Sequence, residues 1–445
     1  MEPRLFRTNI ASSPARRAIW GFIVFAFVLR VCARLYMGAE GYFSGGYSMF
    51  FDMAKSIAAG TGIGFGDGQP ETFRVPLYSL LLAAVTMGRE LFLVVTVVHS
   101  LIGAATLWCT ARLAEVLFNQ TAAVIAAAIA AVYPYYVVHD TALQDTSLYT
   151  LLTAVSILLL LRAHQTSSAW WALVAGLALG ADVMTRVTIA PFAVLAPIWL
   201  AGTRRRRSAL VCAVALALAV APWLIRQYRL TGVFTLSTET GLEVWNGNNA
   251  LTFSHYPEES SDLSKAAAFD SLTLRDRVDL DARSDEAARE RWFLLKGLAY
   301  IREHPGLTIT RDIRKIVAAF GWLPSPRHGR WGNLAHTVSY GPVMTLGLCG
   351  MWLRRKHWRE DAIIYAAFVC FAVATALIFG HTSHRAYLDV YWIAFAAGTL
   401  ESLRTRIFNG RPLGPWLPLH HTFSDTSPNA THTQARQKRS CGNRI

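Results

Sequence analysis

The chain has 445 residues, of which 53% are hydrophobic and 16% are charged, and its mean hydropathy is +0.31. A soluble globule of this length needs more polar residues to cover its surface, so the composition excludes an ordinary soluble protein and indicates a polytopic membrane protein. Lysine and arginine outnumber aspartate and glutamate by 43 to 29, a net charge of +14. In a membrane protein this excess is typical of loops that set orientation, and it requires no nucleic-acid partner.

Ten apolar segments are long enough to cross a hydrocarbon core about 30 Å thick. They lie near 18–37, 92–111, 121–138, 146–163, 169–185, 187–203, 208–225, 333–353, 361–380 and 386–403. The first follows four arginines and lacks a small-residue cleavage site, so we expect a retained signal anchor. We therefore predict an all-α bundle of about ten spans over residues 18–403.

The charged loops predict the orientation of this bundle. If residues 1–17 lie in the cytoplasm, then Arg162, the run 204–207, the cluster 354–359 and the tail 404–445 also lie there, as the positive-inside rule requires. The tail has no hydrophobic periodicity, and from about residue 408 we expect it to be disordered. Both termini are thus predicted to be cytoplasmic.

Two long segments, 38–91 and 226–332, then lie on the outer face. The first contains an amphipathic stretch over 49–58 that predicts a helix lying on the membrane surface. The second has mixed charges over 275–290, which are typical of a solvated helical face. Charges at this boundary are costly unless they are paired or functional, so the candidate chemistry is sought here.

The first outer segment carries Asp52 three positions before Lys55, and the two could form a simple ion pair on one helical face. The alternative is that Asp52 faces a cavity and accepts the proton of an acceptor hydroxyl. Further on, Arg74 precedes Pro76 and Tyr78 at a predicted helix start. This arginine could snorkel to the lipid–water boundary or offer its planar guanidinium to phosphate oxygens.

Polar residues also gather where the chain enters a span at 133–149. His139, Asp140 and Asp145 could hold a divalent metal, but their spacing matches no standard ligand motif. A carboxylate that binds sugar or assists the acceptor base is the preferred interpretation. Asp182 and Arg186, four positions apart, are predicted to form a buried structural salt bridge.

The last polar group, at 380–389, contains His384 and Arg385 beside a second histidine. A boundary histidine is usually structural, whereas an arginine next to two histidines can bind a phosphate.

Several short motifs occur in order between about residues 18 and 403. They are Phe50, Ala54, Gly60 and Gly62; Arg74 to Tyr78; Tyr133-Pro134 leading to an acid; Pro222-Trp223 leading to Arg226 and Tyr228; Trp245 to Asn249; the segment 293–305; and His384 to Tyr387. Their order and spacing resemble bacterial family 39 glycosyltransferases of the GT-C superfamily, which are relatives of protein mannosyltransferases and lipid A aminoarabinose transferases.

This resemblance implies a GT-C bundle that takes a sugar from a polyprenyl-phosphate donor and transfers it outside the cytoplasm to a glycan, lipid or protein. Family members commonly use an acid in the first outer loop, and here Gly46 stands at that position. Asp52 or Glu40 could replace it. Asp145 matches the second acidic position of the family, and Arg74 matches a basic position associated with the lipid phosphate.

The predicted site follows from these matches and from the polar groups above. Its catalytic carboxylates are Asp52, Asp145 and Asp140, and the residues expected to bind the substrate or the donor phosphate are Arg74, Arg226, Arg385, Tyr78, Asn246, Asn248 and His384. Asn246 and Asn248 could contact sugar hydroxyls or could simply form an Asn-Gly turn. No metal ligand is assigned and no cofactor is expected beyond a possible divalent metal.

Two other classes of function stay open. A lipid or sugar carrier or flippase would also be polytopic, but it would tend to have internal repeats and midplane substrate residues, and the sequence has neither. A non-catalytic family member that binds a lipid-linked sugar is the second alternative, because the usual acid is replaced by Gly46.

Overall fold

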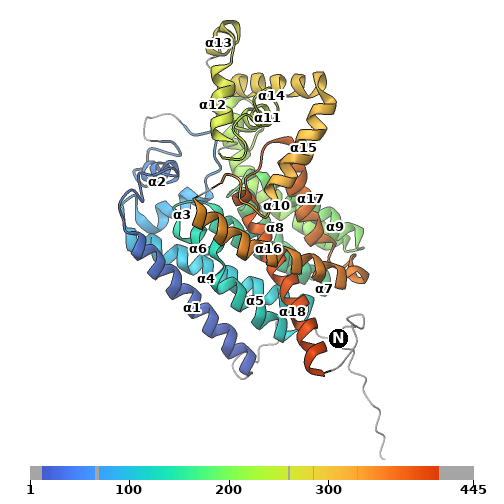
Figure 1. Cartoon of the computed structure of the whole chain (residues 1–445). Coiled ribbons are helices and arrows are strands. Elements are labelled where there is room, and N and C mark those ends of the chain that lie inside the picture. The colour runs from blue at the N-terminus through green and yellow to red at the C-terminus, as the bar shows by residue number, and fades with distance from the viewer. Residues whose placement is uncertain (1–12, 66–69, 259–260, 284, 328, 410–445) are drawn as a thin grey trace, which may run out of the picture.

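The computed structural model describes residues 13–65, 70–258, 261–283, 285–327 and 329–409, and within these ranges the chain is almost entirely helical (Figure 1). The single β contact in the described ranges is an isolated bridge between Gly64 and Pro70. The predicted all-α membrane class is confirmed. The arginines at positions 4 and 7 and the tail from residue 410, including its predicted disorder, lie outside the described residues.

The bundle contains a helix for each of the ten predicted segments. These helices are α1 (Pro14–Met37), α4 (Phe92–Leu117), α5 (Gln120–Val132) with α6 (Pro134–Thr141), α7 (Thr146–Thr166), α8 (Ala169–Val183), α9 (Ala190–Gly202) after the short η2 (Val187–Ile189), α10 (Arg206–Thr231), α16 (Arg330–Leu353), α17 (Ala362–Leu377) and α18 (Asp389–Asn409). Two short 3-10 helices, η3 (Arg355–His357) and η4 (Thr382–Leu388), flank α17.

Not all of these helices could cross a membrane by length and composition alone. In the described ranges, α1, α4, α7 and α10 are long and apolar enough to cross a membrane. The bent pair α5 and α6 adds a fifth if the two helices form one span. Helices α8 and α17 and the η2–α9 segment are apolar but shorter.

The span predicted over 121–138 is broken. Helix α5 ends at Val132, α6 begins at Pro134, and their axes differ by 54°. A proline has no backbone N–H and disfavours a helical conformation in the residue before it, so the preceding helix stops at Tyr133. The break redirects the chain toward Asp145, which lies at the start of α7.

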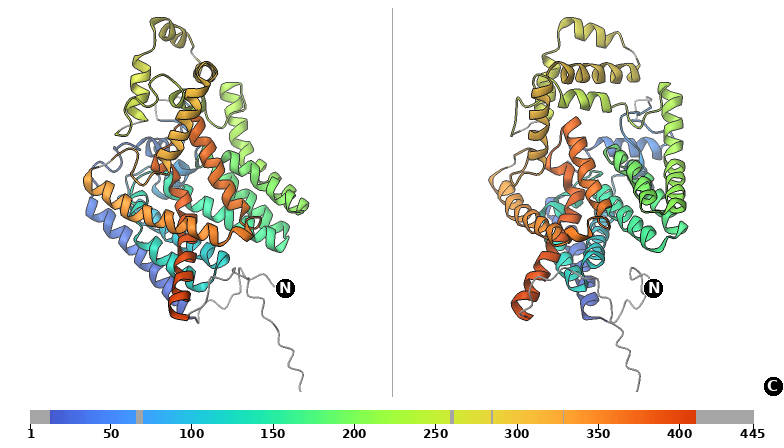
Figure 2. Two further views of the ribbon diagram at one scale, coloured as in Figure 1. Left: turned by 45° about the vertical axis from the view of Figure 1, so that its right-hand side comes forward. Right: turned by 90° about the vertical axis from the view of Figure 1, so that its right-hand side faces the viewer.

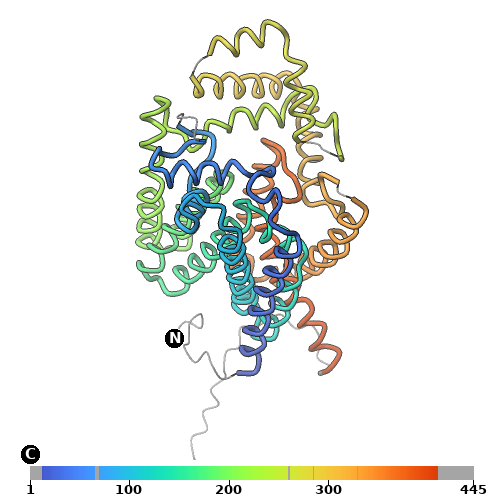
Figure 3. Tube along the Cα trace, turned by 90° about the vertical axis from the view of Figure 1, so that its left-hand side faces the viewer, coloured from blue at the N-terminus to red at the C-terminus, as the bar shows by residue number. Residues whose placement is uncertain are grey.

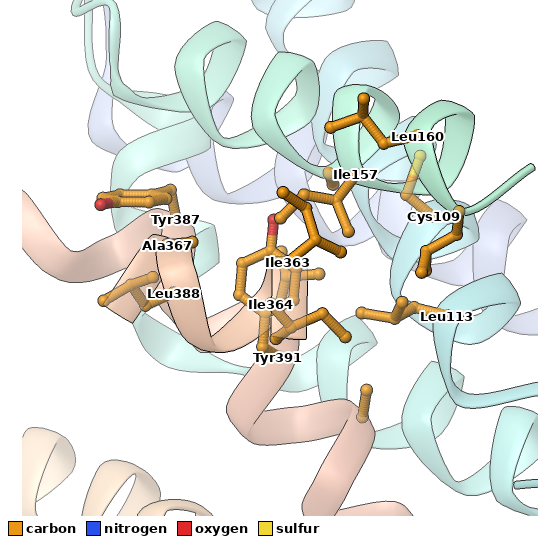
Figure 4. Close-up of a cluster of buried hydrophobic side chains, with 14 of the residues drawn as sticks. Cys109, Leu113, Ile157, Leu160, Ile363, Ile364, Ala367, Tyr387, Leu388 and Tyr391 are labelled. Carbon is orange, nitrogen blue, oxygen red and sulfur yellow. The ribbon is translucent and has the colours of Figure 1, made fainter. Parts of the chain in front are cut away.

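The core consists of small residues at the centre and larger ones around them. Six alanines of α5, at positions 122, 123, 126, 127, 130 and 131, are fully buried where α5 packs on α1, α4 and α18. Small side chains let helix backbones approach closely in a membrane. Figure 4 shows a neighbouring cluster in which Leu113 of α4, Ile157 of α7, Ile363 of α17 and Tyr391 of α18 meet.

Helices α8 and α10 approach each other through glycines. A Cβ atom at Gly176 would lie 2.3 Å from the carbonyl oxygen of Cys212, and one at Gly180 would lie 2.3 Å from the Cβ of Ala219. The two glycines are four positions apart and share one face of α8, as in other close membrane-helix pairs. This contact fixes the end of α8, from which Arg186 follows.

The two long segments predicted for the outer face lie at one end of the bundle, opposite the first residues of α1 and the last residues of α18 (Figures 2 and 3). The first contains α2 (Met49–Ala58), as predicted, and α3 (Leu77–Thr86). The second contains five helices: α11 (Thr240–Gly247), α12 (Asp262–Asp270), α13 (Leu274–Asp281), α14 (Glu286–Glu303) and α15 (Pro305–Ala319).

The second outer segment has a small core of its own. Trp245, Ala268, Leu280, Trp292 and Phe293 are buried against one another, and the charged residues of α13 face mostly outward. The second outer segment, residues 226–332, therefore packs as a unit over the outer end of the bundle, and we call it the cap.

A buried ion pair joins α1 to α6 inside the bundle. Arg30 Nε lies 2.6 Å from Asp140 Oδ2, and Arg30 also donates to the carbonyl oxygens of Ala26 and Ala131. Arg30 is fully buried and Asp140 is 6% exposed. Gly103 of α4 makes room for the pair, since a Cβ atom there would lie 2.2 Å from Asp140 Oδ2.

We predict that Arg30→Ala lowers the stability of the protein by about 3–5 kcal/mol, because it leaves the Asp140 carboxylate buried without a partner. Thermal denaturation in detergent measures this. The double change Arg30→Met with Asp140→Leu should recover most of the loss, since no charge is then left in the bundle. An unaltered melting temperature in Arg30→Ala would contradict the proposed role of the pair.

Candidate active site

The first element of the site is an ion pair between Asp145 and Arg186. Asp145 precedes α7, and Arg186 follows the end of α8. Arg186 Nε donates to Asp145 Oδ2 at 3.0 Å, and its Nη2 donates to Asp145 Oδ1 and, at 3.0 Å, to Thr146 Oγ1. The guanidinium also lies over the ring of Tyr149, 4.8 Å from its centroid. These contacts fix the direction of the carboxylate.

This pairing corrects the predicted bridge between Asp182 and Arg186. Helix α8 ends at Val183. The Arg186 N–H still donates to the carbonyl oxygen of Asp182 at 2.9 Å, but Arg186 itself has an extended backbone and its side chain bonds Asp145 instead of the Asp182 carboxylate. Asp182 stays fully buried in the bundle. Asp145, at 10% exposed, and Arg186, at 20%, remain accessible at the outer end.

The second element is an ion pair between Arg74 and Glu239. The guanidinium approaches both carboxylate oxygens at 3.0 Å and joins the first outer segment to the start of α11. Glu71 holds the turn before Arg74, because its Oε1 accepts from the backbone N–H groups of Phe73 and Arg74. Burial raises the pKa of both Glu71 and Glu239, and Arg74 opposes this rise at each carboxyl.

Tyr47 and His384 lie near both ion pairs, Asp145–Arg186 and Arg74–Glu239. Tyr47, in the loop before α2, interacts electrostatically with Arg186, Asp145 and Arg74. His384, on η4, interacts with Arg186 and Arg74, and its side chain is exposed. The structure thus brings Arg74, Asp145 and His384 together at the outer end of the bundle.

Beneath His384, a buried network holds η4. Arg385 is fully buried, with Nη1 at 2.7 Å from Asp389 Oδ1 and Nε donating to the carbonyl oxygen of Ala319. Its Cζ lies 3.2 Å from the centroid of the Tyr340 ring. The Tyr133 hydroxyl donates to Asp389 at 3.1 Å. Arg385 therefore positions η4 and, with it, the ring of His384.

Two other predicted residues lie in structural contacts. Tyr78 is 1% exposed, and its hydroxyl is 2.9 Å from His99 Nε2. Asp140 is the partner of Arg30 described above. In each case the polar group is occupied inside the bundle.

Asp52 lies on α2, in a surface ion pair with Lys55 at 2.7 Å. The two side chains are 36% and 48% exposed, so Asp52 is open to solvent. Glu40, its alternative, and Gly46 are exposed in the loop between α1 and α2.

Arg226 and the asparagines are held mainly by backbone atoms. Arg226 donates to the carbonyl oxygens of Glu71 and Ile63 and lies over the ring of Trp223. Asn248 donates to the carbonyl oxygens of Val244 and Leu377. Asn246 instead donates to the side chains of Glu243 and Ser261 at 3.3 and 3.4 Å, and it is only 2% exposed.

Sequence reasoning missed Glu239, Glu71 and Tyr47 as members of the site, and it gave Arg186 the wrong partner. The signal for Arg186 was present, because a charge at the end of an apolar run needs a partner. No local sequence pattern predicts Glu239 as the partner of Arg74, because the two residues are 165 positions apart. No group of three or more metal-binding side chains occurs in the parts of the chain that the structure describes.

Comparison with known proteins places this geometry in context. A family profile described as dolichyl-phosphate-mannose-protein mannosyltransferase matches residues 73–225, which include Arg74, Asp145 and Arg186. The apo oligosaccharyltransferase of Archaeoglobus fulgidus has a similar structure, with a TM-score of 0.54 at 14% identity over 88% of this chain and 51% of that chain.

The oligosaccharyltransferase AglB of the same organism, solved with an inhibitory peptide and a dolichol-phosphate, gives a TM-score of 0.53 at the same identity and coverage. This chain spans about half the length of these enzymes. No curated protein sequence matches it. The predicted resemblance to the GT-C superfamily is confirmed, and the chain has the GT-C fold.

We predict that Arg74→Gln destabilises the protein more at pH 8 than at pH 5. Without Arg74 the pKa of the Glu239 carboxyl, already raised by burial, rises further. A carboxyl with a raised pKa contributes stability only while it is protonated, and that contribution is lost as the pH rises through the folded-state pKa. Melting temperatures at the two pH values measure the effect.

The matched control is Arg74→Gln combined with Glu239→Gln. This variant has no ionisable group at the pair, so the additional loss at pH 8 should shrink to the part that comes from Glu71, whose raised pKa Arg74 also opposes. Equal losses at both pH values in Arg74→Gln alone would mean that Glu239 does not depend on Arg74.

Proposed function

We propose that this protein is a membrane glycosyltransferase of the family 39 type. It moves a sugar from a polyprenyl-phosphate donor to a glycan, lipid or protein acceptor on the outer face of the bacterial inner membrane, with both termini in the cytoplasm. The observation that carries the proposal is the Asp145–Arg186 pair, with Arg186 partly exposed, near Arg74 and His384 at the outer end of a GT-C fold. The bound dolichol-phosphate of AglB supports a lipid-linked donor.

In the proposed reaction, an acceptor hydroxyl attacks the anomeric carbon of the donor sugar. A carboxylate takes the hydroxyl proton, the new glycosidic bond forms, and the bond from the sugar to the phosphate oxygen breaks with its electron pair staying on the phosphate. The prenyl phosphate leaves as an anion, so no general acid is needed. Inversion at the anomeric carbon follows from a single displacement.

Asp145 is the proposed carboxylate at the reacting centre. Arg186 orients it through two charge-assisted hydrogen bonds. Asp52 is exposed on α2, so it is proposed to act as the base from the side of the incoming acceptor. Asp140, already bound to Arg30, is assigned to support the helix that leads to Asp145.

Positive groups stabilise the departing phosphate in this proposal. Arg74 is 40% exposed and can turn from Glu239 toward phosphate oxygens, and His384 faces the same space. Such preformed charge is most effective where water is excluded. Arg385 and Tyr78 hold the elements behind these groups. Asn246 and Asn248, at 2% and 3% exposed, are assigned to hold the end of α11 and not to meet sugar hydroxyls.

We predict that Asp145→Asn lowers turnover of a polyprenyl-phosphate sugar by 100-fold or more and that Asp52→Asn causes a smaller loss, since a positioned base contributes roughly 10²–10⁴-fold. Release of polyprenyl phosphate by the purified protein measures this. Asp281→Asn, a change of an exposed acid on α13, is the control and should leave turnover unaltered.

This assay, together with measurements of donor binding and of donor transport in vesicles, distinguishes the alternative functions. Wild-type turnover in both Asp145→Asn and Asp52→Asn would reject the catalytic assignment. If the wild-type protein binds the donor but releases no prenyl phosphate, it is a non-catalytic binder. Movement of the intact donor across a vesicle bilayer would instead identify a carrier.

A further inference from the structure

Helix α17 is too short to cross a hydrocarbon core by itself. Its 16 residues correspond to about 24 Å of helix, against a core thickness of about 30 Å. The buried Arg354–Asp361 pair marks the end of α17 that is opposite to the cap, so the missing length lies beyond Leu377. Val369, Val373 and Leu377 form an exposed apolar stripe, as expected for a surface that faces lipid. The hydrocarbon therefore reaches about one helical turn past Leu377.

Helix α15 of the cap lies beside α17 at this depth. The Lys315 ammonium donates to the carbonyl oxygen of Ala376 at 2.6 Å. The ring of Phe320, directly after α15, has its centroid 5.3 Å from that of Phe371. The two contacts are five positions apart on each chain segment and run in opposite directions, so α15 packs antiparallel on the last turns of α17 (Figure 1). The C-terminal half of α15 is therefore level with the α17 span.

One side of this part of α15 is apolar and uncovered. Ile309, Ile313 and Val317 are spaced four positions apart, and each is between 59% and 64% exposed. By the antiparallel register, Val317 lies about level with Ala374, and Ile313 lies about level with Ile378, just past the end of α17. Ile309 is about 6 Å further out. The exposed side chains of α17 and α15 thus cover consecutive depths of one bilayer leaflet.

Each of the four charged residues of α15 has a partner in the protein. Lys315 is fully buried and pairs with Asp312 at 2.9 Å. Arg311 donates to two backbone carbonyl oxygens of the loop after α11, and Arg314 lies over two aromatic rings of the same loop. Charges at a membrane boundary are expected to face such partners. The pattern therefore fits a helix that has one side on the protein and the other on lipid.

After α15 the chain turns back toward the outer end. The Thr382 N–H donates to the carbonyl oxygen of Ser325 at 2.9 Å, which places Ser325 beside η4, past the end of α17. The turn between α15 and this contact carries Trp322 and Leu323, which are 54% and 52% exposed. The carbonyl oxygen of Trp322 accepts from Thr337 Oγ1 at 3.1 Å. A turn with apolar side chains and a bonded carbonyl suits hydrocarbon surroundings.

We propose that the C-terminal half of α15 and the turn after it are embedded in the leaflet nearest the cap, where Ile313, Val317 and Trp322 contact lipid hydrocarbon chains. The occupant of this surface is the bilayer itself, because the surface continues the lipid-facing stripe of α17 in depth. The contact anchors the cap in the membrane. It involves no residue of the candidate active site and stands whether or not the chain transfers a sugar.

The test uses the full chain in phosphatidylcholine nanodiscs, with an environment-sensitive fluorescent amino acid in place of Ile313. Lipids with brominated chains quench a fluorophore among the chains, and iodide quenches one in water. We expect the probe at Ile313 to lose most of its emission in brominated lipid and to resist iodide. The control probe replaces Leu274, which is 80% exposed on α13, and should lose its emission to iodide alone.

Two further probes, in place of Ile309 and Val317, measure depth along the same side of α15. Val317 lies about 12 Å deeper, so its probe should be quenched more by brominated chains and less by iodide than the probe at Ile309. Equal responses of the probes at Ile313 and Leu274 would overturn the proposal. Resistance of the Ile313 probe to both quenchers would also overturn it, because a second copy or another protein would then cover the stripe.

Discussion

The structure depends on one constraint, that a charge inside a bilayer must be paired. Arg30 with Asp140, and Arg385 with Asp389, lie inside the bundle with almost no exposure. The first pair joins α1 to α6 across 110 positions, and the second, only four positions apart, joins η4 to the start of α18. A buried pair adds little net stability compared with apolar packing, but it is costly to break. Such pairs therefore fix which helices meet, while the alanine and glycine contacts determine how closely they approach.

The same constraint distinguishes charged residues with a structural role from those that are available to a substrate. Inside the bundle, pairs are shielded and their hydrogen bonds are directed to backbone carbonyls as well as to the carboxylates. At the outer end the pairs Asp145–Arg186 and Arg74–Glu239 keep between 10% and 40% of their side-chain surface accessible. A substrate can exchange for a protein partner only at pairs of this second kind. Asp145 and Asp140 are almost equally buried, at 7% and 6% exposed, so what distinguishes them is that Asp145 lies at the outer end with a partly exposed partner, whereas Asp140 is paired with the fully buried Arg30.

The sequence was sufficient for the helical class, the ten apolar segments, the surface helix over 49–58 and the end of the bundle at which the polar residues gather. The sequence did not predict contacts whose two partners come from different segments of the chain. Asp182 and Arg186 have ideal helical spacing, yet α8 ends before Arg186 and the carboxylate of Asp145 takes its place. Glu239 and Tyr78 show the same limit, since their contacts depend on how the outer segments fold over the bundle. Pro134 was visible in the sequence, but the apolar run through it hid the 54° bend.

The positive charge at the outer end lies largely in ion pairs. Arg186 pairs with Asp145 and Arg74 pairs with Glu239, so each guanidinium is partly neutralised by its own carboxylate. The side chain of Arg74 is the more exposed of the two, at 40% against 20%. A phosphate that approaches this end of the bundle can therefore exchange for Glu239 more readily than for Asp145, which agrees with the separate proposed roles of Arg74 at the phosphate and Asp145 at the reacting centre.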